Sequence, residues 1–207
     1  MNCEQVDLEP IEVERFQVKE VLKALLHSII FQRALGSSQM RDTDSDLFNL
    51  SYVRSDSRVI DTKVEDQTEA FGKILERDET MAAHQVCISF FERRLRPSTF
   101  SLFRSEEKVV WERWNIPLLV HARDDLGGQA ERAQRNLALE DTLRQRIEFV
   151  LTMASGKKEH IPPVDGLGGD TPWFDITWES RSSWTSSGLD IFKSLLSSPP
   201  LLSTAQR

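Results

Sequence analysis

The sequence predicts an α+β fold in which a mostly antiparallel sheet packs against two or three long helices. Residues 15–35 and 129–155 carry apolar side chains at helical spacing, whereas several shorter segments alternate between apolar and polar residues, as strands do. The order of these elements along the chain is mixed, which is typical of the α+β class. At 207 residues, 39% of them hydrophobic, the chain has the size of one domain.

The first quarter of the chain predicts a short strand, a buried helix, a polar loop and a second strand. Residues 6–13 alternate loosely and form the first strand, and residues 15–35 form the clearest helix. The apolar stripe of this helix is wider than a surface helix needs, so we expect it to lie largely buried against the sheet. The stripe consists of Val18, Val21, Leu22, Leu25, Leu26, Ile29 and Ile30. Residues 37–46 are a polar loop, and residues 47–55 form the second strand.

The middle of the chain predicts another helix and two long strands. Residues 64–80 form a weaker helix around Phe71, Ile74 and Leu75. Residues 85–94 form a strand whose core face carries Val86, Ile88 and Phe90.

The strand over residues 109–121 divides into two faces. The face expected in the core carries Val110, Trp114, Ile116, Leu118 and Val120, with Glu112 as the only misfit. The opposite face carries Trp111, so something must cover this indole, or it belongs to a contact surface. Pro117 removes a ladder donor and predicts an edge strand or a bulge.

The last third of the chain predicts a long helix, a connector and a final strand. The helix covers residues 129–155, and an irregular Pro/Gly-rich connector follows. Residues 173–180 form the strand, with Phe174, Ile176 and Trp178 on one face, and residues 188–196 form a short helix. We assign residues 1–198 to the domain and expect residues 199–207 to be a disordered tail.

Charge and cysteine content exclude several classes of protein. The formal net charge of −7 disfavours a general nucleic-acid binder, because neutralising phosphates requires a basic surface. No apolar run approaches the roughly 20 residues that span a bilayer, and the N-terminus does not resemble a signal peptide. The two cysteines, Cys3 and Cys87, form no disulfide framework and suit a reducing compartment. We therefore expect a cytoplasmic protein without a transmembrane segment.

The candidate catalytic and ligand-binding residues do not assemble into an active site. None of the four histidines stands at metal-ligand spacing, and His27 lies inside the buried helix, which favours a hydrogen-bonded structural role. Cys87 lies mid-strand, so we expect an inert thiol. Asp124 and Asp125 are turn residues, and the glycines of 166–170 lack the context of a phosphate loop. The sequence therefore predicts no catalytic residue, no metal site and no cofactor.

One loop carries large apolar residues among polar ones. Residues 96–108 link two strands and are longer than a tight hairpin requires. Phe100, Leu102 and Phe103 lie within this loop. Such residues either fold back onto the body of the domain or anchor a partner, and the residues themselves leave both interpretations open.

Several blocks of sequence recur together in one known family. They are "HSIIFQR" in the first helix, "LFNLSYVR" after the polar loop, "WERWNI" after the aromatic loop, and "HIPPV" after the long helix. With the final aromatic strand and short helix, their order resembles the autophagy-related protein 101 family. Its members are small HORMA-domain subunits of the autophagy-initiation kinase complex.

The resemblance implies a HORMA domain that acts as a non-enzymatic adaptor. Such adaptors pair with the HORMA domain of autophagy-related protein 13, stabilise the kinase complex and act at the phagophore assembly site. A finger built on a Trp-Pro-Phe tripeptide helps them to recruit downstream factors. That position reads Ser101-Leu102-Phe103 here, so Phe103 matches the family, the tryptophan is absent, and Phe100 or Leu102 would substitute for it.

Two alternative functions remain open from the sequence. One is a ubiquitin-conjugating-type α+β enzyme that uses Cys87 as its nucleophile, and the other is a HORMA adaptor of another pathway. Because HORMA domains pack a C-terminal segment against their sheet, the resemblance also implies that residues 173–196 cover the Trp111 side.

Overall fold

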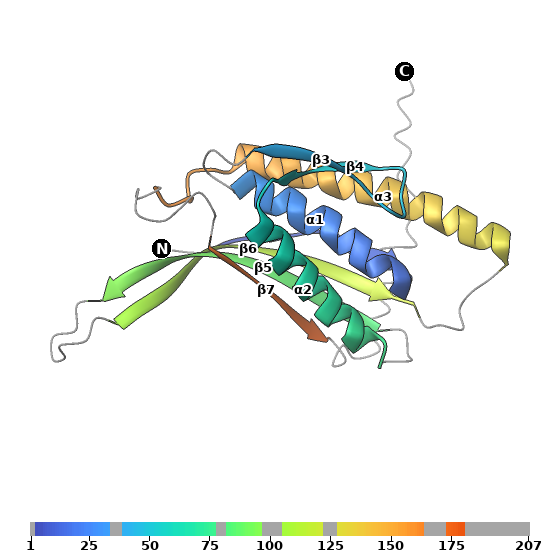
Figure 1. Cartoon of the computed structure of the whole chain (residues 1–207), viewed down its shortest axis with the longest axis horizontal. Helices are drawn as coiled ribbons and strands as arrows, with labels where there is room; N and C mark the ends of the chain where they lie inside the picture. The colour runs from blue at the N-terminus through green and yellow to red at the C-terminus, as the bar shows by residue number, and fades with distance from the viewer. Residues whose placement is uncertain are drawn as a thin grey trace, which may run out of the picture.

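The computed structural model arranges the chain in three layers (Figure 1). A layer of three helices, α1 (Val18–Arg33), α2 (Arg58–Leu75) and α3 (Gln129–Gly156), lies over a sheet. On the other side of the helices lies a separate hairpin of β3 (Met40–Asp44) and β4 (Ser51–Ser55). The structure describes residues 3–33, 39–77, 82–96, 105–121, 128–163 and 173–180.

The main sheet has the order β1-β6-β5-β7, with β2 pairing beside β6 beyond the end of β1. Its strands are β1 (Glu4–Asp7), β2 (Ile11–Val13), β5 (Ala82–Arg96), β6 (Ser105–Val120) and β7 (Phe174–Ser180). The pairs β5–β6 and β5–β7 are antiparallel, whereas β1 and β2 run parallel to β6. The predicted α+β class with a mostly antiparallel sheet is confirmed.

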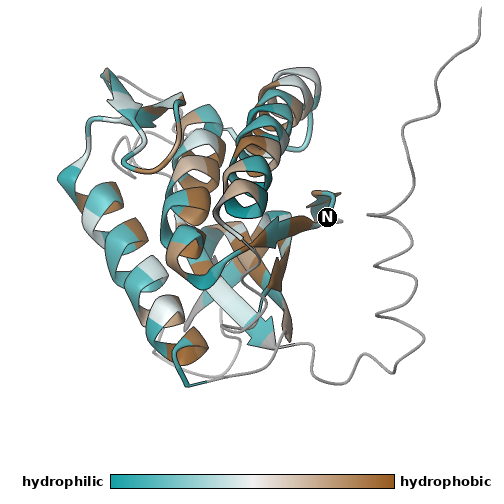
Figure 2. Ribbon diagram, turned by 90° about the vertical axis from the view of Figure 1, so that its right-hand side faces the viewer, coloured by the Kyte–Doolittle hydropathy of each residue, from teal (hydrophilic) through white to brown (hydrophobic). Residues whose placement is uncertain are grey.

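Helix α1 is the centre of the core. Figure 2 shows it between α2 and α3, above the sheet, and β4 packs on its remaining side. All seven residues of its predicted apolar stripe are buried. The prediction of a largely buried helix is therefore confirmed. The apolar stripe of α1 is wide because other elements pack against the helix on nearly every side.

Trp111 lies on the core face of β6, contrary to the prediction from strict alternation. Phe90 pairs with Glu112 and Phe91 pairs with Val110, so Trp111 is the extra residue of a β-bulge. The bulge lets Trp111 and the next residue both be buried. The indole packs 5.5 Å from the ring of Phe90 and 5.8 Å from that of His160. Of residues 173–196, which we expected to cover Trp111, residues 174–180 pair with β5 in the sheet, and residues 181–196 lie outside the described residues.

Glu112, the misfit of the predicted core face, is completely buried because it is paired. Arg33 Nε lies 2.9 Å from both Glu112 carboxylate oxygens, and Arg33 also donates to the Ala154 carbonyl at 3.0 Å. His160 and the indole N–H of Trp114 contact the same carboxylate. A buried charge is tolerated when it is paired and hydrogen-bonded in this way, and this cluster ties the ends of α1 and α3 to β6.

Pro117 lies in an interior strand, so the prediction of an edge strand is wrong. It pairs with Gln85 of β5 on one side. On the other side, β1 ends opposite Asn115 and β2 begins opposite Leu118. The carbonyl of Asn115 accepts a hydrogen bond from Leu8 and therefore faces the β1 side. Backbone groups two residues apart in a strand face the same side, so the nitrogen of Pro117 faces the gap between β1 and β2. No N–H donor is needed there, which is why proline is tolerated.

Several predicted boundaries change. The predicted strand over residues 6–13 is interrupted between β1 and β2, and the polar loop over 37–46 contains β3. Because the β3–β4 hairpin is an outer layer, β3 needs no buried face and shows no apolar alternation. Helix α2 begins six residues earlier than predicted, and Ile74 lies on its exposed side. Its buried residues are Ile60, Val64, Thr68, Phe71 and Leu75.

The predicted strands over 85–94 and 173–180 and the long helix over 129–155 are confirmed, each within a few residues. The predicted helix over 188–196, the domain boundary at residue 198 and the tail lie outside the described residues. None of the helices in the described ranges is long and apolar enough to span a membrane.

Candidate functional site

The environment of the Cys87 thiol is that of a structural residue rather than a nucleophile. Cys87 is buried in the middle of β5, between Asn115 of β6 and Thr177 of β7. Its Sγ donates to the Asn115 side-chain oxygen at 3.1 Å. A nucleophilic thiol needs access and an activating base, so this environment agrees with the predicted inert thiol. Within the described part of the chain, no three His, Cys, Asp or Glu side chains are placed to hold a metal ion.

The predicted finger residues, Phe100, Leu102 and Phe103, lie outside the described residues. The stem that carries their loop is described, because β5 and β6 remain paired as far as Arg96 and Ser105. Figure 1 shows this end of the hairpin projecting beyond the helices.

The base of the stem presents aromatic and charged side chains together. Trp173, at the start of the last strand, is 44% exposed, and the Arg93 guanidinium lies 3.9 Å from the centre of its ring. Phe91 packs 6.2 Å from the same ring, and the Lys108 ammonium lies 3.8 Å from the centre of Phe91. Lys108 also pairs with Asp175. Arg93, near the end of β5, is thus stacked on an indole.

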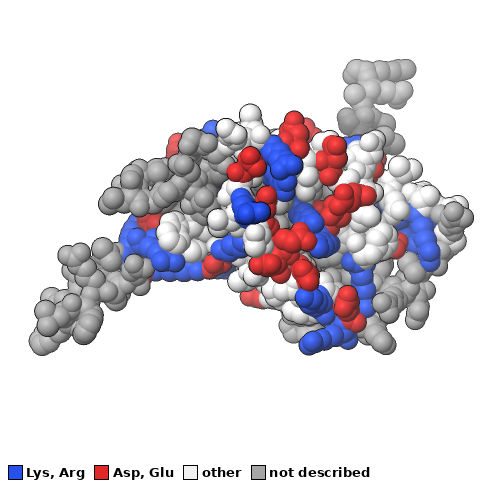
Figure 3. Space-filling view, in the orientation of Figure 1, with Lys and Arg blue, Asp and Glu red and all other residues white. Residues whose placement is uncertain are grey.

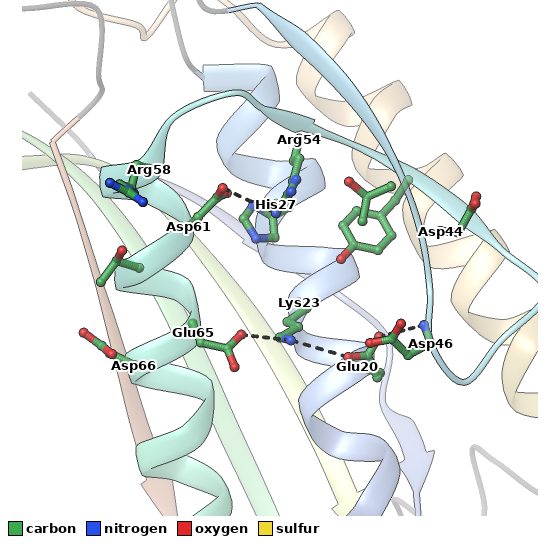
Figure 4. Close-up of a pocket in the computed structure, with 13 residues that line it drawn as sticks. Glu20, Lys23, His27, Asp44, Asp46, Arg54, Arg58, Asp61, Glu65 and Asp66 are labelled. Atoms are coloured by element: carbon green, nitrogen blue, oxygen red, sulfur yellow. Dashed lines mark hydrogen bonds and ion pairs between the residues drawn. The ribbon is translucent and has the colours of Figure 1, made fainter.

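A second surface, here called the charged groove, lies between α1, α2 and the β3–β4 hairpin (Figure 4). It is an open hollow of about 550 Å³. Figure 3 shows acidic and basic side chains interspersed over this face of the molecule. The ionisable side chains that line the groove are Glu20, Lys23, His27, Asp44, Asp46, Tyr52, Arg54, Arg58, Asp61, Glu65 and Asp66.

Ion pairs join the two helices and the hairpin across the groove. Lys23 of α1 lies 2.8 Å from Glu65 of α2 and 3.6 Å from Glu20 of its own helix. Arg54 of β4 lies 3.4 Å from Asp61 of α2. Because these pairs are only partly buried, each contributes modestly to stability, but together they fix the spacing of the three elements.

His27 lies in the wall of the groove and is only 5% exposed. Its ring is stacked on Tyr52, with the centroids 6.1 Å apart. Burial lowers the pKa of His27 to about 4, and the charges of Arg54 and Lys23 act in the same direction, so the ring is neutral at pH 7. The predicted burial of His27 is confirmed. The predicted hydrogen bond is not made by Nδ1, which has no partner within the described residues.

Sequence analysis did not find the charged groove, because its walls come from three separate segments. One signal was present: Glu20, Lys23 and His27 recur at helical spacing on a helix whose other faces are apolar. A polar stripe on a buried helix marks a face that other polar groups cover.

Comparisons with known proteins converge on one family. The family model described as "Autophagy-related protein 101" matches residues 10–166. A relative from Arabidopsis thaliana with the same description is 33% identical over 213 residues, covering 96% of this chain and 97% of the relative. Relatives from Homo sapiens and Xenopus laevis, also so described, are 26% and 25% identical over 177 residues, covering 79% of this chain and 77% of each relative.

Proposed function

Because the chain belongs to the autophagy-related protein 101 family, we propose that it is a non-enzymatic adaptor that pairs with the HORMA domain of autophagy-related protein 13. The family membership gives the chain a role in autophagy, and the α+β architecture is compatible with a HORMA-type fold. The observation that carries the proposal is the likeness to the plant relative over 96% of the chain. The family model, over residues 10–166, includes the elements from β2 to α3.

The adaptor role, rather than catalysis, agrees with the family and with the position of Cys87. The autophagy-related protein 101 family is not a known enzyme family, and the buried, hydrogen-bonded thiol disfavours the ubiquitin-conjugating alternative. The match to this family likewise disfavours a HORMA adaptor of another pathway.

Helix α3 offers the surface for pairing. Three large apolar side chains on it are exposed: Leu137 at 65%, Phe149 at 36% and Leu151 at 42%. The spacing of Leu137 and Leu151 places these two on one face of the helix. The N-terminal half of α3 extends beyond the other helices (Figure 1). Burying such side chains against a like-folded partner would stabilise a dimer, because apolar area removed from water favours association.

The projecting stem offers a second surface, for downstream factors. Phe100, Leu102 and Phe103 would contact these factors, and they follow directly on the stem, where β5 and β6 are still paired and Arg93 stacks on Trp173. In this proposal the protein is cytoplasmic, stabilises the autophagy-initiation kinase complex and is recruited with it to the phagophore assembly site.

Co-elution in gel filtration tests the assignment of the surface. The chain mixed with the autophagy-related protein 13 HORMA domain should elute as a heterodimer, and the double variant Leu137→Ser, Leu151→Ser should elute as separate proteins. Val59→Ser is the control, because Val59 is also an exposed apolar side chain but lies on α2. If the control and the double variant behave alike, α3 is not the pairing surface. If the unaltered chain does not co-elute, the adaptor proposal itself fails.

A further inference from the structure

We propose that the charged groove binds the guanidinium group of an arginine presented by a protein partner. This goes beyond the proposed pairing, because the groove lies between α1, α2 and the β3–β4 hairpin rather than on the outer side of α3. Three independent features of the groove fit this ligand: its charge, its unpaired hydrogen-bonding atoms and its aromatic wall.

The groove has a surplus of negative charge. Six carboxylates line it against three basic side chains. The ion pairs of Lys23 and Arg54 use Glu20, Glu65 and Asp61, whereas Asp46 and Asp66 make no ion pair within the described residues. An anionic ligand would meet repulsion here, and a cationic one would be attracted.

The walls of the groove hold polar atoms without hydrogen-bond partners in the described part of the chain. They include Asp61 Oδ1, Thr43 Oγ1 and Nδ1 of the nearly buried His27. The two oxygens can accept a hydrogen bond, and so can Nδ1 when the imidazole is neutral. Unsatisfied buried acceptors are costly, so a ligand with several donors would gain free energy by meeting them. Arg54 Nε is an unpartnered donor in the same wall and would suit a backbone carbonyl of the partner. The combination therefore favours an arginine within a peptide.

The aromatic wall distinguishes guanidinium from ammonium. His27 and Tyr52 are stacked with an angle of 22° between their planes, and both line the groove. Figure 4 shows the His27 ring between α1 and α2. A planar guanidinium stacks on aromatic faces and carries five donors, whereas a lysine ammonium is a compact, strongly hydrated charge with three. The groove therefore fits arginine better than lysine.

Nuclear magnetic resonance of the ¹⁵N-labelled full-length chain tests this inference. The probe is the tripeptide acetyl-Gly-Arg-Gly-amide, and the comparison peptides carry citrulline, a neutral isostere, or lysine in place of arginine. The arginine peptide should give saturable shifts at the amides of Tyr52, Arg54, Asp61 and Glu65. The lysine peptide should bind at least about fivefold more weakly, and the citrulline peptide should give no saturable shifts.

Matched variants locate the site. Asp61→Asn and Asp66→Asn should each weaken the arginine peptide by about fivefold or more, because each removes one carboxylate from the groove. Glu148→Gln changes the charge by the same amount on the exposed side of α3 and should have no effect. Asp66 is exposed, so its variant gives a result even if Asp61→Asn unfolds the domain. Shifts that do not saturate, equal binding of either comparison peptide, or equal weakening by Glu148→Gln would overturn the inference.

Discussion

Replacing His27 by glutamine should remove much of the acid sensitivity of folding. Burial lowers the pKa of His27 from 6.5 to about 4 in the native state, whereas an unfolded chain restores the ordinary value. The unfolded state therefore binds the proton more tightly. The stability contributed by the neutral, buried ring is complete above about pH 6.5 and is lost as the pH falls from there towards 4.

The size of the effect follows from the two pKa values. A difference of about 2.5 pKa units amounts to about 3 kcal/mol once the pH lies below both values. Between pH 7 and pH 5 the same linkage relation gives a loss of about 2 kcal/mol. This is a large fraction of the stability of an ordinary domain, which is about 5–15 kcal/mol.

Urea denaturation at pH 7 and pH 5 measures this loss in both proteins. Carboxylates that titrate in this range are common to the two proteins, so the difference between the two pH dependences isolates His27. The unaltered chain should lose about 2 kcal/mol more than His27→Gln between the two pH values. Equal losses in the two proteins would refute the reasoning, as would an imidazole proton signal that titrates near pH 6.5 in the native state.

Three further predictions concern the core, the buried ion pair and the finger. Leu25→Ala, in the fully buried stripe of α1, should cost about 2–5 kcal/mol in chemical denaturation, and an unchanged midpoint would contradict its place in the core. Glu112→Gln leaves the buried charge of Arg33 without its partner and should cost about 3–5 kcal/mol, measured in the same way; a loss below 1 kcal/mol would mean that the pair is hydrated. Phe100→Ala with Phe103→Ala should leave the melting temperature nearly unchanged and abolish recruitment of downstream factors, whereas a melting temperature lowered by many degrees would place both rings in the core.

The parts of the fold that depend on local periodicity could be predicted from the sequence. The stripe of α1 and the alternation of Val86, Ile88 and Phe90 in β5 each reflect one element and the layer that it faces. The bulge at Trp111 could not be predicted, because it depends on how β6 pairs with β5. The burial of Glu112 could not be explained from the sequence either, because its partner Arg33 lies 79 residues away along the chain.

The candidate sites could be predicted from the sequence less well than the fold. The charged groove combines residues of α1, α2 and the outer hairpin, and β3 gave no strand signal because neither of its faces is buried. The stacking of Arg93 on Trp173 requires the pairing of β5 with β7, which no local pattern encodes. The finger residues follow from composition and from the family alone.

The most direct test of the adaptor proposal is calorimetry of the full-length chain with the HORMA domain of autophagy-related protein 13. We predict a saturable heat of binding at a ratio of one to one and a higher melting temperature for the mixture, because a partner that binds only the folded state stabilises it. At a free partner concentration of 100 times Kd, the added stability should be about 2.7 kcal/mol. Neither heat nor a shifted melting temperature would contradict the proposed function.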